Sequence, residues 1–298
     1  MSRSLNDRTP TAWLLVLPAI IGLIAFVAVP FGLALGLSLT DLRLGSPLPL
    51  EYVGGQQYRR IFGDPSFQRA LINNGIFALV VVPVQTTLAL GLALLLNRGL
   101  RGMVIFRTLF FMPVVFPMAL VAVVWELIYA PGSTGLLNSF LGVVSFGAWE
   151  PKAFLHDPFW ALPAIMVLSI WQGLGFQMVI LLAGLQAIPD QLYEAAWIDG
   201  AGKVSQFFHV TLPQLRNPLI FVVLLTCILA FRVFDQVQIL TQGGPNDATT
   251  TVMYEAVTAA FSRQQVARAS AMTVVFFVIV LIITLTQRLL VREEREVA

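Results

Sequence analysis

Long apolar runs separated by shorter polar segments recur along the whole chain. Most of them reach the roughly 20 residues that an α-helix needs to cross the hydrocarbon core of a bilayer. The first run is longer than the roughly 7–15 apolar residues of a signal peptide, so we interpret it as a membrane span. The pattern predicts an all-α integral membrane protein with six transmembrane helices, at about 12–39, 70–96, 104–129, 158–188, 218–240 and 269–290.

Some residues inside these runs are polar or break helices. Pro18 and Pro30 predict kinks, or a break, near the ends of the first span. Arg232 and Asp235 interrupt the fifth run three residues apart, on one helix face, where they either pair with each other or face water. In the second span a set of polar side chains is expected to face other helices or a cavity, because an unpaired amide in lipid is costly. These are Asn73, Asn74, Gln85, Thr86 and Thr87.

The composition agrees with a lipid environment. Of the 298 residues, 57% are hydrophobic and only 11% are charged, whereas a soluble domain carries about 25% charged residues. No basic patch is dense enough to predict nucleic-acid binding. Cys227, the single cysteine, excludes an intrachain disulfide and a multi-cysteine metal site.

The distribution of basic residues predicts the orientation in the membrane. Arg98, Arg101 and Arg107 crowd a short loop without acidic residues, which is typical of a cytoplasmic loop. With six spans, ten Lys and Arg residues fall on that side and seven on the other. We therefore expect both tails, residues 1–10 and 291–298, and the polar segment 189–217 in the cytoplasm.

Motifs for catalysis are missing from the sequence. It contains no GxxxxGK[ST], HExxH or GxSxG pattern and no cluster of His, Cys and carboxylates, so we expect no catalytic residue, no metal site and no bound cofactor. Energy for transport must then come from another chain or from an ion gradient. A six-span secondary transporter or channel is the alternative to a subunit of an ATP-driven transporter, and Asp235 is its one candidate ion-coupling carboxylate.

The polar segment contains the sequence EAAWIDGAGKVSQFFHVTLP, at residues 194–213. Its helix-forming start, the glycines at 200 and 202 and the apolar residues before Pro213 predict a short helix, a glycine bend and a second short helix. Small side chains on such a projection allow close approach by another protein. The alternative is an amphipathic helix that lies passively on the membrane.

This stretch resembles the cytoplasmic EAA motif of ABC importer membrane subunits. A second stretch, FRVFDQVQILTQGGPNDATT, resembles the FDxVxxLTxGGPxxxT pattern of the carbohydrate-importer branch, in the subunit type related to the larger maltose-permease subunit. EYVGGQQY, LLLNRGLRG and RTLFFMP add to a resemblance that covers about residues 13–290. The matching EAA positions are Glu194, Ala195, Ala196, Asp199, Gly200, Ala201, Phe208, Leu212 and Pro213.

The resemblance implies the core of a type I ABC importer permease in a bacterial or archaeal cell membrane. It implies that residues 194–213 form a coupling helix in a cleft of an ATPase subunit, and that a pair of such subunits uses ATP and Mg. It further implies a second related permease and an extracytoplasmic binding protein that delivers a sugar, a polyol or a glycerol-phosphate-type solute. This chain itself would be non-catalytic.

The stretch LSIWQGLGFQMV resembles a maltose-permease segment that contributes sugar contacts. The resemblance implies that Ser169, Gln172, Gly173 and Phe176 face the solute pathway, although helix packing explains such residues equally well. Arg232 and Asp235 are the remaining pathway candidates. Arg232 either pairs with Asp235 structurally, which we favour, or meets an anionic group such as a phosphate.

Overall fold

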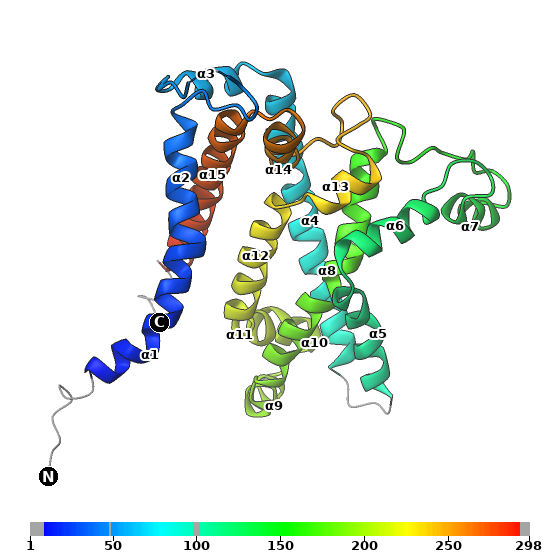
Figure 1. Ribbon diagram of the computed structural model, residues 1–298. Coiled ribbons are helices and arrows are strands. Elements are labelled where there is room, and N and C mark those ends of the chain that lie inside the picture. The colour runs from blue at the N-terminus through cyan, green and yellow to red at the C-terminus, as the bar shows by residue number, and fades with distance from the viewer. Residues whose placement is uncertain (1–8, 48, 98–101, 293–298) are drawn as a thin grey trace, which may run out of the picture. The chain divides into compact units, whose positions relative to one another are not determined.

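The computed structural model describes residues 9–47, 49–97 and 102–292. The predicted tails, together with Arg98 and Arg101 of the basic loop, lie wholly or largely outside these ranges. No β-strand is present in the described part, where the one bridge joins Thr40 and Tyr52. The helices are α1 (Thr9–Leu23), α2 (Val29–Ser38), α3 (Gln56–Phe62), α4 (Pro65–Leu96), α5 (Met103–Val115), α6 (Met118–Ile128), α7 (Leu136–Val144), α8 (Ala161–Gln186), α9 (Asp190–Ile198), α10 (Lys203–Gln206), α11 (Leu212–Gln214), α12 (Arg216–Phe231), α13 (Asp235–Leu240), α14 (Val252–Val257) and α15 (Val266–Arg292) (Figure 1).

Five helical segments of the described chain are long and apolar enough to cross a membrane, and there are six if a bent helix pair is counted as one span. This confirms the predicted all-α membrane fold. The five segments are Leu15–Ser38, Pro65–Leu96, Ala161–Gln186, Arg216–Leu240 and Val266–Gln287, and the bent pair is α5 with α6.

The chain forms two units. One comprises residues 1–64 and 255–278, and the other comprises residues 65–254 and 279–298. In the first unit, α1 and α2 are joined by one π-helical turn at Ile24–Ala28. The turn lies just before Pro30, because a proline ring cannot fit against the carbonyl four residues earlier in a regular α-helix. The predicted irregularity of this span is therefore a widened turn.

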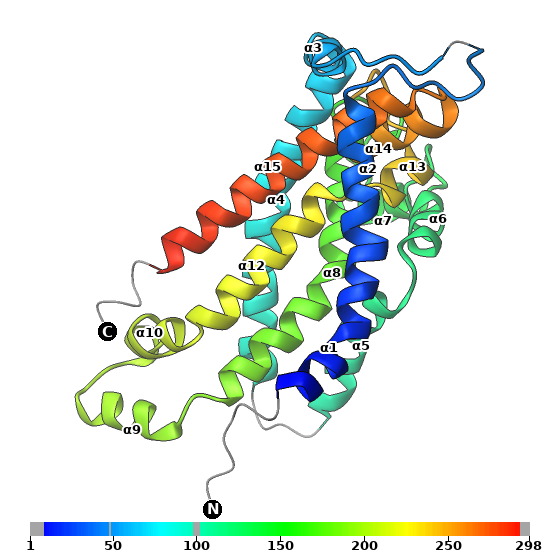
Figure 2. The same cartoon turned by 60° about the vertical axis from the view of Figure 1, so that its left-hand side comes forward.

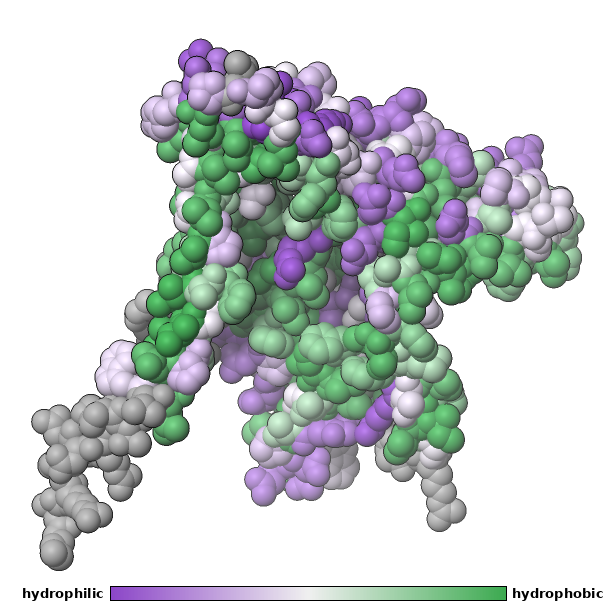
Figure 3. All heavy atoms as spheres, viewed as in Figure 1, coloured by the Kyte–Doolittle hydropathy of each residue, from purple (hydrophilic) through white to green (hydrophobic). Residues whose placement is uncertain are grey.

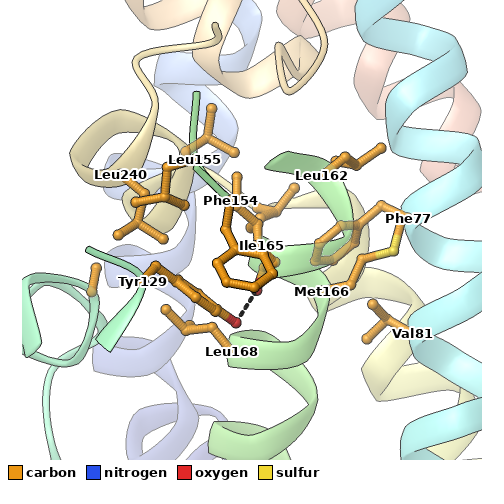
Figure 4. Close-up of a cluster of buried hydrophobic side chains, with 14 of the residues drawn as sticks. Phe77, Val81, Tyr129, Phe154, Leu155, Leu162, Ile165, Met166, Leu168 and Leu240 are labelled. Atoms are coloured by element: carbon orange, nitrogen blue, oxygen red, sulfur yellow. Dashed lines mark hydrogen bonds between the residues drawn. The ribbon is translucent and has the colours of Figure 1, made fainter. Parts of the chain in front are cut away.

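In the second unit, α4, α8 and α12 lie side by side, and α5 packs on α8 (Figures 1 and 2). Two buried apolar clusters hold these helices together. One lies near the start of α8 and includes Phe77, Ile165 and Leu168. Figure 4 shows Tyr129 in this cluster, and the dashed line marks the bond of 2.9 Å that its hydroxyl donates to the carbonyl of Ala164. The other lies near the end of α8 and includes Ala89, Met178, Leu181, Leu215 and Val222.

The polar side chains of the second span are mostly buried, as predicted. Asn73 donates to the carbonyls of Asp247 and Thr250, at 3.0 and 2.9 Å. Asn74 donates to the carbonyl of Phe231 at 3.1 Å and accepts from the backbone N–H of Val252 at 2.8 Å. Gln85 and Thr86 are also buried, but Thr87 is exposed, so for that residue the prediction is wrong.

Two predicted spans are not continuous helices. In the third, α5 and α6 meet at an angle of 101°. The break falls at Phe116, whose extended backbone is the conformation favoured before a proline, here Pro117. In the fifth, α12 ends at Phe231 and α13 begins at Asp235. Arg232 and Asp235 are therefore not on one helix face, which corrects the prediction.

Candidate functional site

A polar cavity lies in the middle of the second unit. Its volume is about 280 Å³, and residues of α4, α6, α8, α12 and α13 line it. Its lining includes Phe77, Val81 and Ala230 of the first apolar cluster, and the second apolar cluster lies beyond the lining residues Gln85, Gly173 and Thr226, toward the other ends of these helices. The lining residues are Phe77, Val81, Gln85, Met118, Ser169, Gln172, Gly173, Thr226, Leu229, Ala230, Arg232, Val233, Phe234, Asp235 and Gln236.

Five of the six predicted pathway residues line this one cavity. They are Ser169, Gln172, Gly173, Arg232 and Asp235; Phe176 is not part of the lining. Sequence reasoning did not assign Gln85, Thr226 or Gln236 to the pathway. The polar character of Gln85 inside an apolar span was a signal for it, but nothing in the sequence distinguished Thr226 from an ordinary helix residue.

Arg232 and Asp235 carry the only charges of the cavity lining. Both side chains are exposed, and among the described residues no ion pair joins them. The pairing favoured from the sequence is therefore wrong. The end of α12 places the guanidinium there: Arg232 is the C-terminal cap of that helix, and Asp235 opens α13 after a break. A cation and an anion thus remain available at the cavity wall.

Hydrogen bonds tie the cavity residues to neighbouring elements. Gln236 donates from Nε2 to Ser169 Oγ at 3.0 Å, which joins α13 to α8. Gln172 donates from Nε2 to the carbonyl of Phe116 at 3.2 Å, at the break between α5 and α6. A Cβ atom on Gly173 would lie 2.4 Å from Gln85 Nε2. Gly173 therefore leaves room for the Gln85 amide between α4 and α8 beside the cavity.

Besides the cavity, the candidate site includes a helical hairpin that joins α8 to α12. It consists of α9, a turn at 199–202, α10, a π-helical turn at Phe207–Thr211 and α11. The structure thus has the predicted helix, glycine bend and second helix. In Figures 1 and 2 the hairpin lies at the end of α8 and α12 opposite α13, and Figure 3 shows hydrophilic residues gathered over it.

The glycine bend is a Schellman motif. Gly200 has φ +80° and donates to the carbonyl of Trp197 at 3.0 Å, while Ala201 donates to the carbonyl of Ala196 at 2.8 Å. These two bonds satisfy the last carbonyls of α9 and require a residue in the left-handed region, where glycine has no steric cost. This turn also positions four other residues of the EAA-like stretch, which are Ala195, Ala196, Asp199 and Ala201.

Side-chain contacts that sequence reasoning missed close the hairpin. Tyr193 and Thr211 share a hydroxyl–hydroxyl bond of 3.0 Å, and Gln206 donates to the carbonyl of Ala201 at 3.1 Å. Glu194 is exposed, and its carboxylate makes no hydrogen bond or ion pair with any other residue that the structure describes. Pro213 lies in α11, just before α12 begins.

Large apolar side chains project from the hairpin. Trp197, Ile198 and Val204 are each at least 73% exposed, and Phe208 is 57% exposed. No residue of α9 or α10 is buried. Apolar side chains gathered on an otherwise polar projection are typical of a surface that another protein covers.

Apolar helices around a central polar cavity, with a polar hairpin at one end, define a multi-pass membrane permease. The chain belongs to the family of binding-protein-dependent transport system inner membrane components, whose family profile matches residues 85–296. It is therefore a multi-pass inner-membrane protein.

Individual relatives agree with this family. The chain is 36% identical over 284 residues to the probable ABC transporter permease protein YurN of Bacillus subtilis, covering 95% of this chain and 96% of YurN. It is 34% identical over 269 residues to the diacetylchitobiose uptake system permease protein NgcF of Streptomyces coelicolor, covering 87% and 76%. A bacterial alginate ABC transporter, solved in complex with an alginate pentasaccharide-bound periplasmic protein, has the same fold, with a TM-score of 0.81 at 21% identity over 96% of both chains.

Proposed function

We propose that this chain is the membrane-spanning permease subunit of an ATP-driven importer for a sugar or a related polyol or glycerol-phosphate-type solute. In this proposal the chain neither catalyses a reaction nor binds nucleotide. It converts ATP-driven movement in a partner into opening and closing of the central cavity.

One observation carries the proposal: the helices that line the cavity are the helices that the exposed hairpin joins. Gln172 on α8 lies 14 residues before the end of that helix, which is about 21 Å at 1.5 Å per residue. From the other end of the hairpin, α12 leads directly to Thr226 and Arg232. A displacement of the hairpin therefore acts on both sides of the cavity through rigid helices.

The partner of the hairpin would be an ATPase subunit, in a pair that binds ATP and Mg. Trp197, Ile198 and Val204 would enter its cleft, and the small side chains of Ala195 and Ala196 allow close approach. Because the Glu194 carboxylate has no bonding partner in the described chain, its role in the EAA-like motif would be a contact with that subunit. The hairpin and both chain termini would then face the cytoplasm.

The opposite end would receive solute from an extracytoplasmic binding protein, as the complexed alginate transporter suggests. A second, related permease would complete the pathway. The cavity has the chemistry that sugars need, because amide and hydroxyl groups of Gln85, Gln172 and Thr226 can bond hydroxyls while Phe77 and Phe234 offer apolar ring faces. The names of NgcF and of the alginate transporter support an oligosaccharide.

Two glycines of the hairpin allow a matched test. A Cβ at Gly200 or at Gly202 would meet no atom within 4 Å, but Gly200 has φ +80° whereas Gly202 has φ −71°. Valine is strongly disfavoured at positive φ, so Gly200→Val should distort the bend and Gly202→Val should not. We expect co-purification of the ATPase and solute-stimulated ATP hydrolysis to fall about tenfold or more in the first variant only, since about 1–2 kcal/mol or more of strain opposes the docked shape.

The comparison contradicts the proposed coupling if both variants keep wild-type ATPase association and wild-type stimulated hydrolysis. Equal loss in both variants would also count against the specific role of the Schellman turn. Circular dichroism and the elution volume in detergent control for misfolding of the whole chain.

A further inference from the structure

The first unit contains a second cavity, which shares no residue with the central one. Its volume is about 120 Å³, and it lies where the loop after α2 and the helix α3 meet the start of α15. All of its lining residues belong to the unit made of residues 1–64 and 255–278. They are Asp41, Leu42, Arg43, Gln57, Arg60, Gln265, Ala267 and Arg268.

The walls of this cavity are fixed by bonds within the chain. Ala267 donates from its backbone N–H to the carbonyl of Leu42 at 3.1 Å, and Leu44 donates to the carbonyl of Gln264 at 2.9 Å. Gln57, which is buried, donates from Nε2 to the carbonyl of Thr40 at 3.0 Å and to Asp41 Oδ1 at 3.1 Å. The site is therefore preformed rather than assembled by a ligand.

Positive charge exceeds negative charge at this cavity. Three guanidinium groups, of Arg43, Arg60 and Arg268, face one lining carboxylate, that of Asp41. Asp41 Oδ1 lies 3.5 Å from Arg60 Nη1 and 4.0 Å from Arg43 Nε. Arg268 pairs with Asp64 through Nη2. Two carboxylates thus serve three guanidinium groups, and one positive charge remains uncompensated.

One donor at the cavity is buried and unused. Among the described residues Arg268 Nε has no hydrogen-bond partner, although it is shielded from solvent. Buried donors without an acceptor are rare in folded proteins, and each points to an acceptor such as water or an ion at that place. Its position beside an excess of positive charge favours an anionic acceptor over a neutral one.

We propose that this cavity binds a phosphate group. The planar, permanently charged guanidinium matches phosphate oxygens in geometry as well as in charge. The volume of about 120 Å³ is less than half that of the central cavity, so a single anionic group fits here better than a sugar. Because α2 and α15 belong to candidate membrane spans and the cavity lies at their ends, a phospholipid headgroup and free phosphate are both possible sources.

The proposal accounts for a sequence feature that the permease function leaves unexplained. Arg43, Arg59 and Arg60 lie in the predicted outside loop and weaken the charge bias that sets orientation. Two of these three line the cavity, whereas Arg59 lies in a separate hollow with Val53, Gly55 and Gln56. Arg59 therefore offers a matched control, on the same helix as Arg60.

Native mass spectrometry of the full chain, purified from phosphatidylglycerol-containing membranes in mild detergent, tests the proposal. We expect the wild type to retain phospholipid, and the double variant Arg43→Gln, Arg60→Gln to retain about tenfold less, because two charge-assisted contacts are lost. Arg59→Gln should retain the wild-type amount. If the double variant does not fold, Arg43→Gln alone serves, since that side chain is the most exposed of the three.

Calorimetric titration of delipidated chain with inorganic phosphate separates the two sources. If the wild type retains no lipid but binds phosphate, and Arg43→Gln loses that binding, the result supports a free-anion site. If the wild type retains lipid and Arg43→Gln does not, the result supports a headgroup site. Equal lipid retention and equal phosphate binding in all variants would overturn the proposal. Loss of binding in Arg59→Gln equal to that in the other variants would also overturn it. A third such result would be that neither lipid nor phosphate binds and the arginines hold an acidic protein segment instead.

Discussion

Gly175 determines how closely α5 approaches α8. A Cβ atom at this position would lie 2.0 Å from the carbonyl oxygen of Phe110 and 2.7 Å from its carbonyl carbon. Both are backbone atoms of α5, so no side-chain rotation relieves the clash. Close backbone approach through small residues is a common way to pack helices in membranes, where water supplies no hydrophobic driving force between helices.

Gly175→Ala should therefore destabilise the chain. We expect a loss of about 1–3 kcal/mol in the free energy of unfolding, the usual cost of overpacking, and a lower thermal midpoint in detergent. Gly91→Ala on α4 is the control, because a Cβ there meets no atom within 4 Å and alanine favours the helix. Equal midpoints for the two variants would show that α5 does not approach α8 this closely.

For single residues, the sequence indicated which side chains are candidates for the pathway, but not which atoms each of them contacts. The stretch around Ser169 and Gln172 predicted pathway residues, and the structure brings most of them to one cavity. The same stretch contains Gly175, whose role depends on which backbone lies opposite. That depends on tertiary packing, and no local pattern reveals it. Arg232 illustrates the same limit. Its spacing from Asp235 suggested that the two residues pair on one helix face, but α12 ends before Arg232, so they do not share a helix.

At the scale of elements, two asparagines of α4 hold the chain that follows α12. Asn74 bridges the carbonyl of Phe231 and the N–H of Val252, and Asn73 binds the loop carbonyls of Asp247 and Thr250. Thr251 adds a bond of 3.0 Å from Oγ1 to the carbonyl of Val233. These side chains replace the helical bonds that α12 loses where it ends.

Asn74→Leu should uncouple these elements. The variant leaves the carbonyl of Phe231 and the N–H of Val252 without their partner, and each buried unsatisfied group costs about 1–3 kcal/mol. Hydrogen–deuterium exchange should rise at 231–234 and at 252. Thr87→Leu on the same helix is the control, since Thr87 is exposed. Unchanged exchange in Asn74→Leu would mean that other contacts hold the break.

The elements themselves were largely predictable, because apolar run lengths and glycine positions act locally. The hairpin bend followed from Gly200, and the widened turn in the first span from Pro30. The breaks at Phe116 and after Phe231 were missed as breaks. Pro117 and the charged residues Arg232 and Asp235 lie at these places, but the hydrogen bonds from other helices that make an interrupted helix tolerable there could not be read from the sequence.

At the scale of the whole molecule, the source of energy separates the proposed importer from the alternative of an ion-driven transporter. Asp235 is exposed at the cavity and is the only carboxylate of its lining. A proton- or sodium-coupled carrier needs such a carboxylate at the midplane, whereas an ATP-driven permease does not.

We expect the isolated chain in liposomes to take up no oligosaccharide under a proton or sodium gradient. The complex with its ATPase, partner permease and binding protein should accumulate solute when ATP and Mg are supplied on the ATPase side. Gradient-driven uptake by the chain alone that Asp235→Asn abolishes would establish the alternative. The solute itself is best identified by a ligand screen on the binding protein that co-purifies with the complex.

The chain bends by 101° where α5 meets α6, and at this bend Gln172 of α8 donates to the Phe116 carbonyl. If α8 slid away from the bend, this bond would be lost. Gly175 clamps α5 onto the same stretch of α8. The proposed coupling therefore predicts that α5 and the bend move together with α8 as one block when the hairpin is displaced. The cavity would then change its opening by displacement of this block relative to the wall formed by α12, which carries Arg232 at its end.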